Sequence, residues 1–213
     1  MTLCELFCAV CEERYFHLHP SEVSYRIRRV GRRTVHILFE WSHGMEDWLG
    51  NLDFCPVRTV LSGERLLVHR GFLRAYLAVR ERLHCALSDG AIGRLIIGGY
   101  SHGAALCALT VADTHALCQA RGIEVAGVGF GAPRVLWGFG KPTVLRRFLA
   151  VRCGHDLVTH LPPRALGFSH GSTLLSLPAP HRMTPWDAHR EASYRTALAA
   201  SGDGSRGVFS FFP

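Results

Sequence analysis

The segment GYSHG at residues 99–103 restricts the possible fold of this chain more than any other part of the sequence. An apolar run at residues 95–97 leads directly into it, and a run rich in small residues, 104–108, follows at once. A sharp turn from a buried strand into a helix needs this order, because the corner residue adopts a strained backbone and its inner neighbours have no room for side chains. The pattern therefore predicts a strand–turn–helix unit with the hydroxyl of Ser101 projecting from its corner.

Hydrophobic periodicity predicts strands and helices in alternation around this turn. Strands are expected at 22–29, 34–39, 55–61, 65–69, 94–98, 123–130, within 144–152, at 165–168 and at 172–177; helices are expected at 1–16, 44–52, 71–87, 103–121 and 189–200. Alternation in the centre of the chain implies a mostly parallel sheet with helices on both faces. The two early hairpins would extend one edge of that sheet as antiparallel strands, so we predict an α/β fold.

The length and composition suit one domain. With 213 residues, 48% of them apolar and 19% charged, the chain can bury a substantial core, and it has no internal repeat or linker-like segment. We therefore expect a single domain over residues 1–213. No apolar run approaches the roughly 20 residues of a membrane span. Residues 1–10 carry no basic residue and are interrupted by Glu5, which favours a cytoplasmic protein, with a secreted mature chain as the alternative.

The basic residues are spread along the chain. The formal net charge is +7, and Lys141 is the single lysine. The densest group lies on the predicted first hairpin and comprises Arg26, Arg28, Arg29, Arg32 and Arg33. We interpret it as a solvated sheet face, with attraction to an anionic lipid surface as the alternative. Because no nucleic-acid-binding motif accompanies the charge, nucleic acid is not an expected partner.

The eight cysteines are scattered through the sequence. Several lie in apolar segments, where a free thiol behaves as a small hydrophobic residue. Cys4, Cys8 and Cys11 would share one face of a helix, and His17 or His19 could complete a metal site with them. Thiols in the core or on the surface are the favoured interpretation, so we expect no metal site.

A serine at such a turn is a weak nucleophile until a base takes its proton, and the base needs an acid to orient it. In a fold of this kind the acid and then the histidine follow the serine, each at the end of a later strand. Asp156 follows the apolar segment 148–151 and has the position expected of the acid. Asp187 is its rival, although no strand separates it from the next histidine. Asp113 is expected to be solvated in the middle of a helix.

The base has several candidates. His189 is favoured, because it follows the last strand region and opens the final helix, as the chain order requires. His170, between two short strands, is the alternative. The histidines that come after Ser101 and near or beyond Asp156 are His155, His160, His170, His181 and His189.

Several motifs follow one another along the chain: GYSHGAA at 99–105, FGAPR at 130–134, DLVTHLPP at 156–163, GFSH at 167–170, and DAH at 187–189 with Tyr194. In this order they resemble the motifs of the class 3 lipases, the filamentous-fungal type within the α/β-hydrolase superfamily. The resemblance covers about residues 35–199. It implies the α/β-hydrolase fold, Asp156 as the acid and His189 as the base, and it gives His170 a non-catalytic position.

The segment FEWS at residues 39–42 stands where that family has F-R-G followed by Ser or Thr. The resemblance implies that Ser42 supplies one donor of an oxyanion hole and the backbone N–H of His102 the second. Glu40 and Trp41 replace the family's arginine and glycine, and tryptophan cannot adopt the positive φ of glycine at low cost. A catalytically weak or inactive relative that binds lipid or a partner is therefore an alternative.

The resemblance implies a serine hydrolase that cleaves carboxylic esters, of the acylglycerol type, through a Ser-Asp-His triad and an acyl-enzyme. An acyltransferase or thioesterase with the same triad is a further alternative. The expected partners are a lipid or small ester substrate and a lipid interface, with no metal or organic cofactor. Residues 44–52 are either a short lid or part of the core. Trp137, Phe139 and the aromatic residues of 209–212 either line an acyl site or only pack.

Overall fold

The computed structural model of the chain describes residues 1–12, 15–18, 23–40, 54–88, 90–179 and 183–212. Ser42 and the predicted helix at 44–52, and with it the suggested lid, lie outside the described residues.

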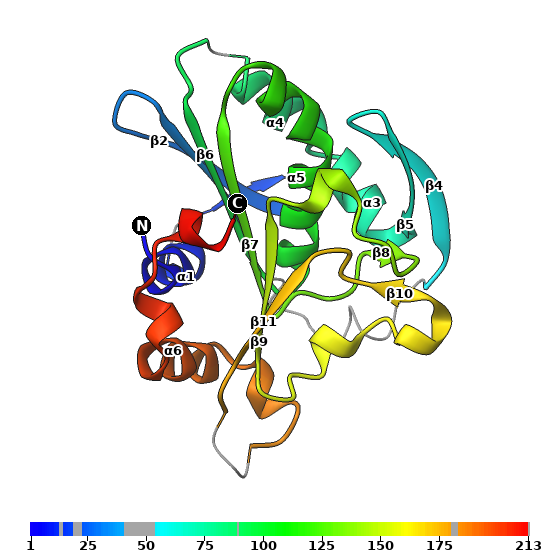
Figure 1. Ribbon diagram of the computed structural model, residues 1–213, viewed down its shortest axis with the longest axis vertical. Helices are drawn as coiled ribbons and strands as arrows, with labels where there is room; N and C mark the ends of the chain where they lie inside the picture. The colour runs from blue at the N-terminus through cyan, green and yellow to red at the C-terminus, as the bar shows by residue number, and fades with distance from the viewer. Residues whose placement is uncertain (13–14, 19–22, 41–53, 89, 180–182, 213) are drawn as a thin grey trace.

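The larger of two sheets has the strand order β1-β2-β3-β6-β7-β9-β11 (Figure 1). The strands are β1 (Phe16–Leu18), β2 (Val23–Val30), β3 (Thr34–Phe39), β6 (Arg94–Tyr100), β7 (Glu124–Phe130), β9 (Phe148–Cys153) and β11 (Thr173–Leu177). From β3 to β11 each strand runs parallel to its neighbour, whereas β1 and β2 are antiparallel. The predicted mostly parallel sheet with an antiparallel edge is confirmed.

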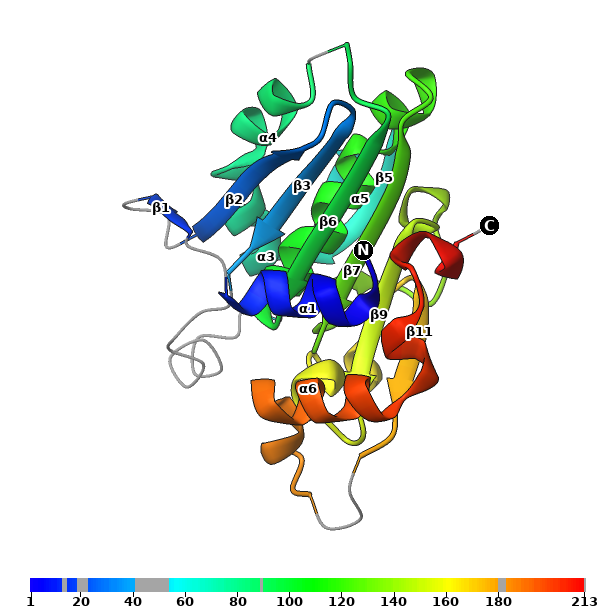
Figure 2. The same cartoon turned by 90° about the vertical axis from the view of Figure 1, so that its left-hand side faces the viewer.

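Helices cover both faces of this sheet, as Figures 1 and 2 show. One face carries α5 (His102–Ala120), with α3 (Arg70–Leu77) and α4 (Arg80–Ala86) beyond it. The other face carries α1 (Leu3–Glu12) and α6 (Glu191–Ala200).

Strand β6 illustrates why both faces are apolar. Leu95 and Ile97 pack in the cluster that contains α5, whereas Ile96 packs in the cluster that contains α1. Successive side chains of a strand point to opposite faces, so a strand covered on both sides becomes one uninterrupted apolar run. That run delivers the chain to Ser101 at the carboxyl edge of the sheet.

The predicted helix at 71–87 is two helices, α3 and α4, with a break at Ala78 and Val79. At the break the N–H of Val79 bonds to the carbonyl of Tyr76, three residues back instead of four. The apolar stripe continues across the break, since Tyr76, Val79 and Leu83 are all fully buried. Because the stripe keeps helical spacing, periodicity could not reveal the break.

The second hairpin does not extend the main sheet, which corrects the prediction. It consists of β4 (Pro56–Leu61) and β5 (Glu64–His69), and it forms a four-stranded sheet of order β10-β8-β5-β4 with β8 (Leu136–Trp137) and β10 (Phe168–Ser169). Its strands bury Leu61 and Val68 in the same cluster as α3 and α5 and leave the other face to solvent. The strand predicted at 165–168 is wrong in its first part, where a 3₁₀ turn, η3 (Arg164–Leu166), precedes β10.

The chain ends with two 3₁₀ turns, η5 (Gly202–Ser205) and η6 (Val208–Phe211). Thr2 pairs with Gly207, so both ends lie together (Figure 1). Phe209, Phe211 and Phe212 pack against the cluster that contains α1 and α6, which favours packing over an acyl site for these residues. All eight cysteines are free thiols, and Cys107, Cys118 and Cys153 are buried. None of the helices in the described part of the chain has the length and apolar character that crossing a bilayer takes.

Asp113 is buried, not solvated as predicted. It lies in the middle of α5, and its carboxylate accepts hydrogen bonds from Tyr76 (2.6 Å), Arg80 (2.6 and 3.0 Å) and His84 (2.7 Å). Burial alone would raise the pKa of Asp113, but hydrogen bonds from Arg80, Tyr76 and His84 outweigh it and lower the pKa. The carboxylate therefore ties α3 and α4 to α5 and so supports the helix that follows Ser101.

Replacing Asp113 by alanine should lower the free energy of unfolding by about 2–4 kcal/mol, because Tyr76 and Arg80 lose their shared acceptor. Since the folded-state pKa is lowered, this stabilisation is present above the unfolded pKa and is lost as the pH falls through the folded pKa. Urea unfolding at neutral and acidic pH measures both effects. Glu124→Ala is the control, because its ion pair with Arg94 is exposed and should contribute less than about 1 kcal/mol. Equal losses in the two variants would contradict the prediction.

Candidate active site

Ser101 occupies the corner between β6 and α5 with φ of +56°. In the described residues only one other residue besides glycine, Ser62, has a positive φ. The N–H of Ser101 donates to the carbonyl of Phe130 on β7 (2.9 Å), and its own carbonyl accepts from Ala104 (3.0 Å). The strained corner is thus held from both the sheet and the helix.

The two glycines of the corner are required by close backbone contacts. A Cβ at Gly99 would lie 2.1 Å from the carbonyl oxygen of Gly103. A Cβ at Gly103 would lie 2.7 Å from the carbonyl oxygens of both Phe39 and Glu40. The corner at Ser101 therefore closes only with glycine at both positions, as the sequence predicts. The end of β3 lies against this corner.

The structure brings the three predicted side chains together. The imidazole of His189 lies 2.9 Å from the Oγ of Ser101 through Nε2 and 2.8 Å from Oδ2 of Asp156 through Nδ1. All three residues are at most 3% exposed. Because a carboxylate only accepts hydrogen bonds, Nδ1 carries the proton, and Nε2 is left to accept from the serine hydroxyl.

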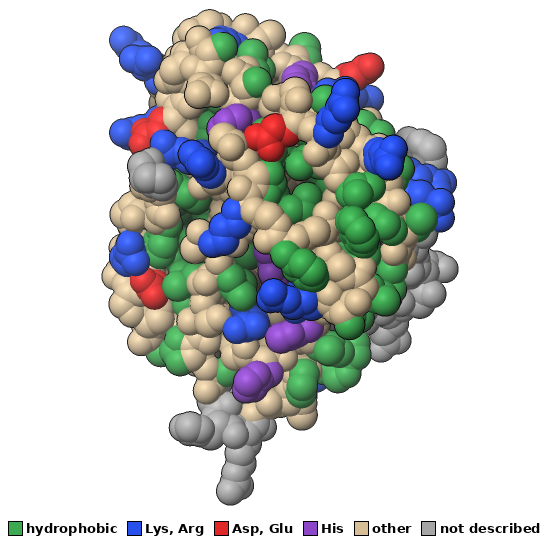
Figure 3. Space-filling view, turned by 45° about the vertical axis from the view of Figure 1, so that its right-hand side comes forward, with side chains coloured by type: hydrophobic (Ala, Val, Ile, Leu, Met, Phe, Trp, Pro, Cys, Tyr) green, Lys and Arg blue, Asp and Glu red, His purple; other side chains and the backbone are tan. Residues whose placement is uncertain are grey.

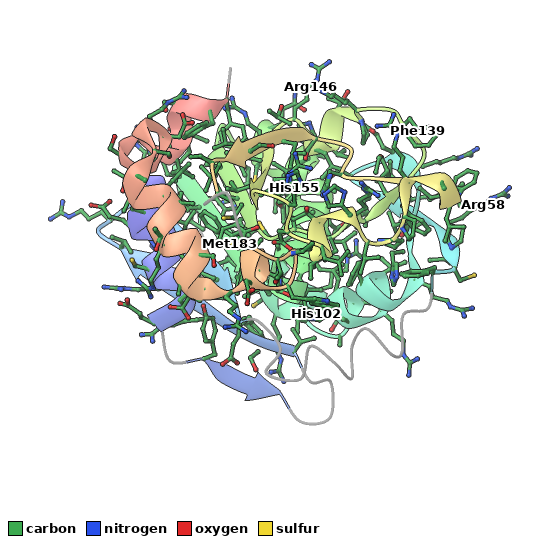
Figure 4. All side chains as sticks on the ribbon, turned by 90° about the horizontal axis from the view of Figure 1, so that it is seen from below. Arg58, His102, Phe139, Arg146, His155 and Met183 are labelled. Atoms are coloured by element: carbon green, nitrogen blue, oxygen red, sulfur yellow. The ribbon has the colours of Figure 1, made fainter. Side chains whose placement is uncertain are left out.

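Each member of this group comes from the carboxyl end of the main sheet. Ser101 follows β6, Asp156 follows β9, and His189 ends the 3₁₀ turn η4 (Asp187–His189), just before α6. Figure 4 looks onto this end of the molecule and labels His102, the residue that follows Ser101. The order of the three residues along the chain, and their positions at the ends of strands, therefore agree with the arrangement expected for a serine at a strand–turn–helix corner.

The carboxylate of Asp156 has a full set of partners. Tyr194 on α6 donates its hydroxyl proton to Oδ2 (2.6 Å), and the N–H of Val158 donates to Oδ1 (2.9 Å). Burial, together with Asp156 itself, raises the pKa of Tyr194 well above its usual value, so the phenol stays a neutral donor. Sequence reasoning missed this contact, although Tyr194 stood in the motif that pointed to His189.

His189 is also held by residues that carry no charge. The ring of Tyr100 stacks on it at 5.1 Å with an angle of 21° between the planes, and the Tyr100 hydroxyl donates to the His189 carbonyl. Gly131 has φ of +58°, and a Cβ there would lie 2.8 Å from Cε1 of His189. The imidazole is therefore enclosed by close packing as well as by hydrogen bonds.

The rival residues lie elsewhere. His170 uses Nε2 to donate to the carbonyl of Ala132 (2.9 Å). The carboxylate of Asp187 accepts a hydrogen bond from the hydroxyl of Thr184 and forms an exposed ion pair with Arg190. The structure thus joins Ser101 to neither rival.

The side chain of His102, the residue after Ser101, packs against a cluster of rings and has a lowered pKa. Burial, with a smaller effect of the neighbouring His69, lowers the pKa of His102 to about 4. Its ring lies 5.8 Å from that of Phe72, and His69 stacks on the same phenyl ring at 4.2 Å. His102 is the first residue of α5, so its backbone N–H is one of those that point out of the helix end.

Removing the hydroxyl of Tyr194 should lower kcat about tenfold and leave KM unchanged, since one of the hydrogen bonds that hold Asp156 is lost. Steady-state kinetics of Tyr194→Phe on a soluble ester measure this split. A variant that only loosened the fold would lower the melting temperature without this change in kcat. Unchanged kcat in a correctly folded Tyr194→Phe protein would contradict a positioning role.

Comparison with known protein families places this chain beside lipases. The profile of the family described as "Lipase (class 3)" matches residues 36–166, more than half of the chain. A lipase from Rhizomucor miehei is 28% identical over 153 residues, which are 65% of this chain and 40% of that protein. The chain thus spans about two fifths of the length of that relative.

Solved structures share the fold. A Rhizomucor miehei lipase propeptide complex has a TM-score of 0.60 at 24% identity, covering 78% of this chain and 55% of the other. A mono- and diacylglycerol lipase from Aspergillus oryzae has a TM-score of 0.62 at 19% identity, with 92% and 76% covered. A triacylglycerol lipase from Penicillium expansum has a TM-score of 0.64 at 14% identity, with 97% and 87% covered. The predicted α/β-hydrolase fold is confirmed.

Proposed function

Because the chain belongs to the class 3 lipase family, we propose that it hydrolyses carboxylic esters of lipids, with Ser101 as the nucleophile. The observation that carries the proposal is the continuous hydrogen-bonded chain from Ser101 through His189 to Asp156. Two relatives named as lipases of mono-, di- or triacylglycerols suggest an ester of the acylglycerol type. The substrate partner would then be a lipid or small ester, met at a lipid interface by peripheral contact.

The proposed reaction has two halves. Nε2 of His189 takes the proton of Ser101 while Oγ attacks the ester carbonyl carbon, which gives a tetrahedral intermediate. The bond to the alcohol oxygen then breaks, His189 returns the proton to the leaving alcohol, and an acyl-enzyme remains. Water attacks the acyl-enzyme with His189 again as the base, which releases the carboxylic acid and restores Ser101. Asp156 holds the imidazole in the tautomer that both halves need.

The oxyanion of each intermediate would be stabilised at the start of α5. The backbone N–H of His102 would donate there, assisted by the positive end of the helix dipole. Ser42 is the second donor in this proposal, on the strength of the family motif at residues 39–42. No step calls for a metal or an organic cofactor.

We also propose that residues 1–213 act as one domain. The two apolar clusters that support this view lie on opposite faces of the same sheet, and residues of β3, β6 and β7 contribute to both. The hydrogen-bonded chain of Ser101, His189 and Asp156, here called the relay, draws on β6, β9 and η4. It therefore needs the whole carboxyl edge of the sheet.

A fluorophosphonate probe, which reacts with activated serines, tests the proposed nucleophile. The wild-type protein should be labelled, whereas Ser101→Ala should not, and peptide mapping should find the label on Ser101. A folded protein that is neither labelled nor active on short- and long-chain esters would instead be a hydrolase-fold binding protein. Product analysis with added acceptor alcohols or thioesters distinguishes hydrolysis from acyl transfer and thioester cleavage.

A further inference from the structure

A cavity outside the group of Ser101, His189 and Asp156 has a strongly basic lining. It has a volume of about 310 Å³ and lies between the loop after β8, strand β9 and the turn from β10 to β11. Arg134, Lys141, Arg152 and Arg164 line it together with His170, and its lining contains no aspartate or glutamate. Lys, Arg and His side chains gather in the lower middle of the face drawn in Figure 3.

Among the described residues, these basic side chains have no acidic partners. None of the ion pairs found among the described residues includes Arg134, Lys141, Arg152 or Arg164. Arg134 donates to the carbonyls of His160 (2.7 Å) and Pro162 (3.1 Å), and Arg152 donates to the hydroxyl of Ser176 (2.9 Å). Neutral acceptors therefore orient the guanidinium groups but leave their charge uncompensated.

Arg152 also has a buried N–H without an acceptor. Its Nε is inaccessible to solvent and has no hydrogen-bond partner in the part of the chain that the structure describes. A buried donor left in this state costs about 1–3 kcal/mol, and more when the group is charged. Unsatisfied buried donors are few in native structures, and this one lies on a residue that lines the basic cavity.

The charges at the cavity also act on one another. Burial, and then the positive charges of Arg164 and Arg152, lower the pKa of Arg134. Burial, with further contributions from Arg134 and Arg152, lowers the pKa of His170 to about 4. His170 is therefore neutral at physiological pH, and the positive charge of the cavity comes from its arginines and its lysine.

We propose that this cavity binds the phosphate group of a phosphate ester. Guanidinium groups match the planar pairs of oxygens that a phosphate presents, and several of them converge here without an acid between them. Phe139, Phe168 and Leu174 add apolar groups to the lining, and Arg164 lies over the ring of Phe139 at 4.9 Å. A phosphate that carries an organic group therefore fits this lining better than a bare inorganic anion.

The cavity is separate from the relay but shares a segment with it. Gly131 contacts His189, Ala132 accepts the hydrogen bond of His170, and Arg134 reaches the cavity. Residues 131–134 thus have the relay on one side and the basic cavity on the other. Phosphate binding needs neither the hydroxyl of Ser101 nor ester hydrolysis, so it can be tested whether or not the proposed function holds.

Isothermal titration of the full chain with glycerol phosphate and with inorganic phosphate tests the site. We expect millimolar or tighter binding, weakened at least about tenfold in Arg152→Gln and in Arg164→Gln, because each removes a charged donor. Arg146→Gln is the matched control, since it removes the same charge at an exposed position that points outward in Figure 4. It should change the affinity less than about twofold, because Arg146 does not line the cavity. Arg164 is itself exposed, so its variant keeps the test valid if Arg152→Gln fails to fold.

Vesicles distinguish the two sources of the phosphate. Flotation with phosphatidylcholine vesicles, with and without phosphatidic acid, shows whether a lipid headgroup enters the cavity. Retention that needs phosphatidic acid and is lost in Arg164→Gln but kept in Arg146→Gln indicates a lipid. Binding of glycerol phosphate without such retention indicates a soluble ester. The proposal is overturned if neither phosphate compound nor vesicle binds, or if the cavity variants bind as well as Arg146→Gln does.

Discussion

Replacing His189 by alanine should lower kcat for a short-chain ester by about 10⁴-fold or more, because Ser101 then has no base. His189 is nearly fully buried and joins Ser101 to Asp156, so no second imidazole can take its place without rearrangement. Initial rates on nitrophenyl esters of increasing chain length measure the loss. KM should change much less than kcat, since the imidazole acts in the transition state.

His170→Ala is the matched control for that loss. His170 follows Asp156 along the chain, as His189 does, but it bonds to the Ala132 carbonyl and not to Ser101. Its removal should change kcat by less than about threefold, the range of an ordinary substitution away from the reacting atoms. If His170→Ala lost as much activity as His189→Ala, the choice of base would be wrong.

Exchanging Asp156 for asparagine should lower kcat by about 10⁴-fold, although the side chain keeps its shape. The carboxylate accepts from His189, Tyr194 and Val158, whereas an amide has only one oxygen to offer. An amide N–H opposite Nδ1 favours the imidazole tautomer that cannot accept the serine proton. Stopped-flow acylation with a chromogenic ester measures the affected step directly.

Asp187→Asn provides the comparison for this exchange. Asp187 lies two residues before His189, but its carboxylate is exposed and faces Thr184 and Arg190. Its exchange should leave kcat within about threefold of the wild-type value. Activity in Asp156→Asn above a tenth of wild type, or an equal loss in Asp187→Asn, would refute the assignment of the acid.

Local chemistry made the centre of the fold predictable. The corner at Ser101 requires glycine on both sides. In the structure, a Cβ at either glycine would collide with a backbone atom. The parallel strands that flank it are buried on both faces and therefore stand out as apolar runs. Asp156 and His189 were predicted from chain order and from the family's motifs, not from any local signal of their own.

Contacts between distant segments could not be predicted in this way. The partners of Asp113 lie about 30 residues before it, so its position in a helix suggested solvent. The hydrogen bond from Tyr194 to Asp156 joins α6 to the end of β9, and periodicity carries no information on such a meeting. Apolar and polar residues alternate along the second hairpin as they do in any edge strand. Only tertiary packing decides which sheet the hairpin joins.

The neutral imidazole of His102 has a consequence for titration experiments. With a pKa of about 4, this ring gains no proton across roughly pH 5–8, where an ordinary histidine would change its charge. It then keeps one charge state beside Ser101, and an inflection of the rate profile in that interval has to come from another group. His102, although it stands next to Ser101 in the chain, therefore adds no inflection to the pH profile of the rate in that interval.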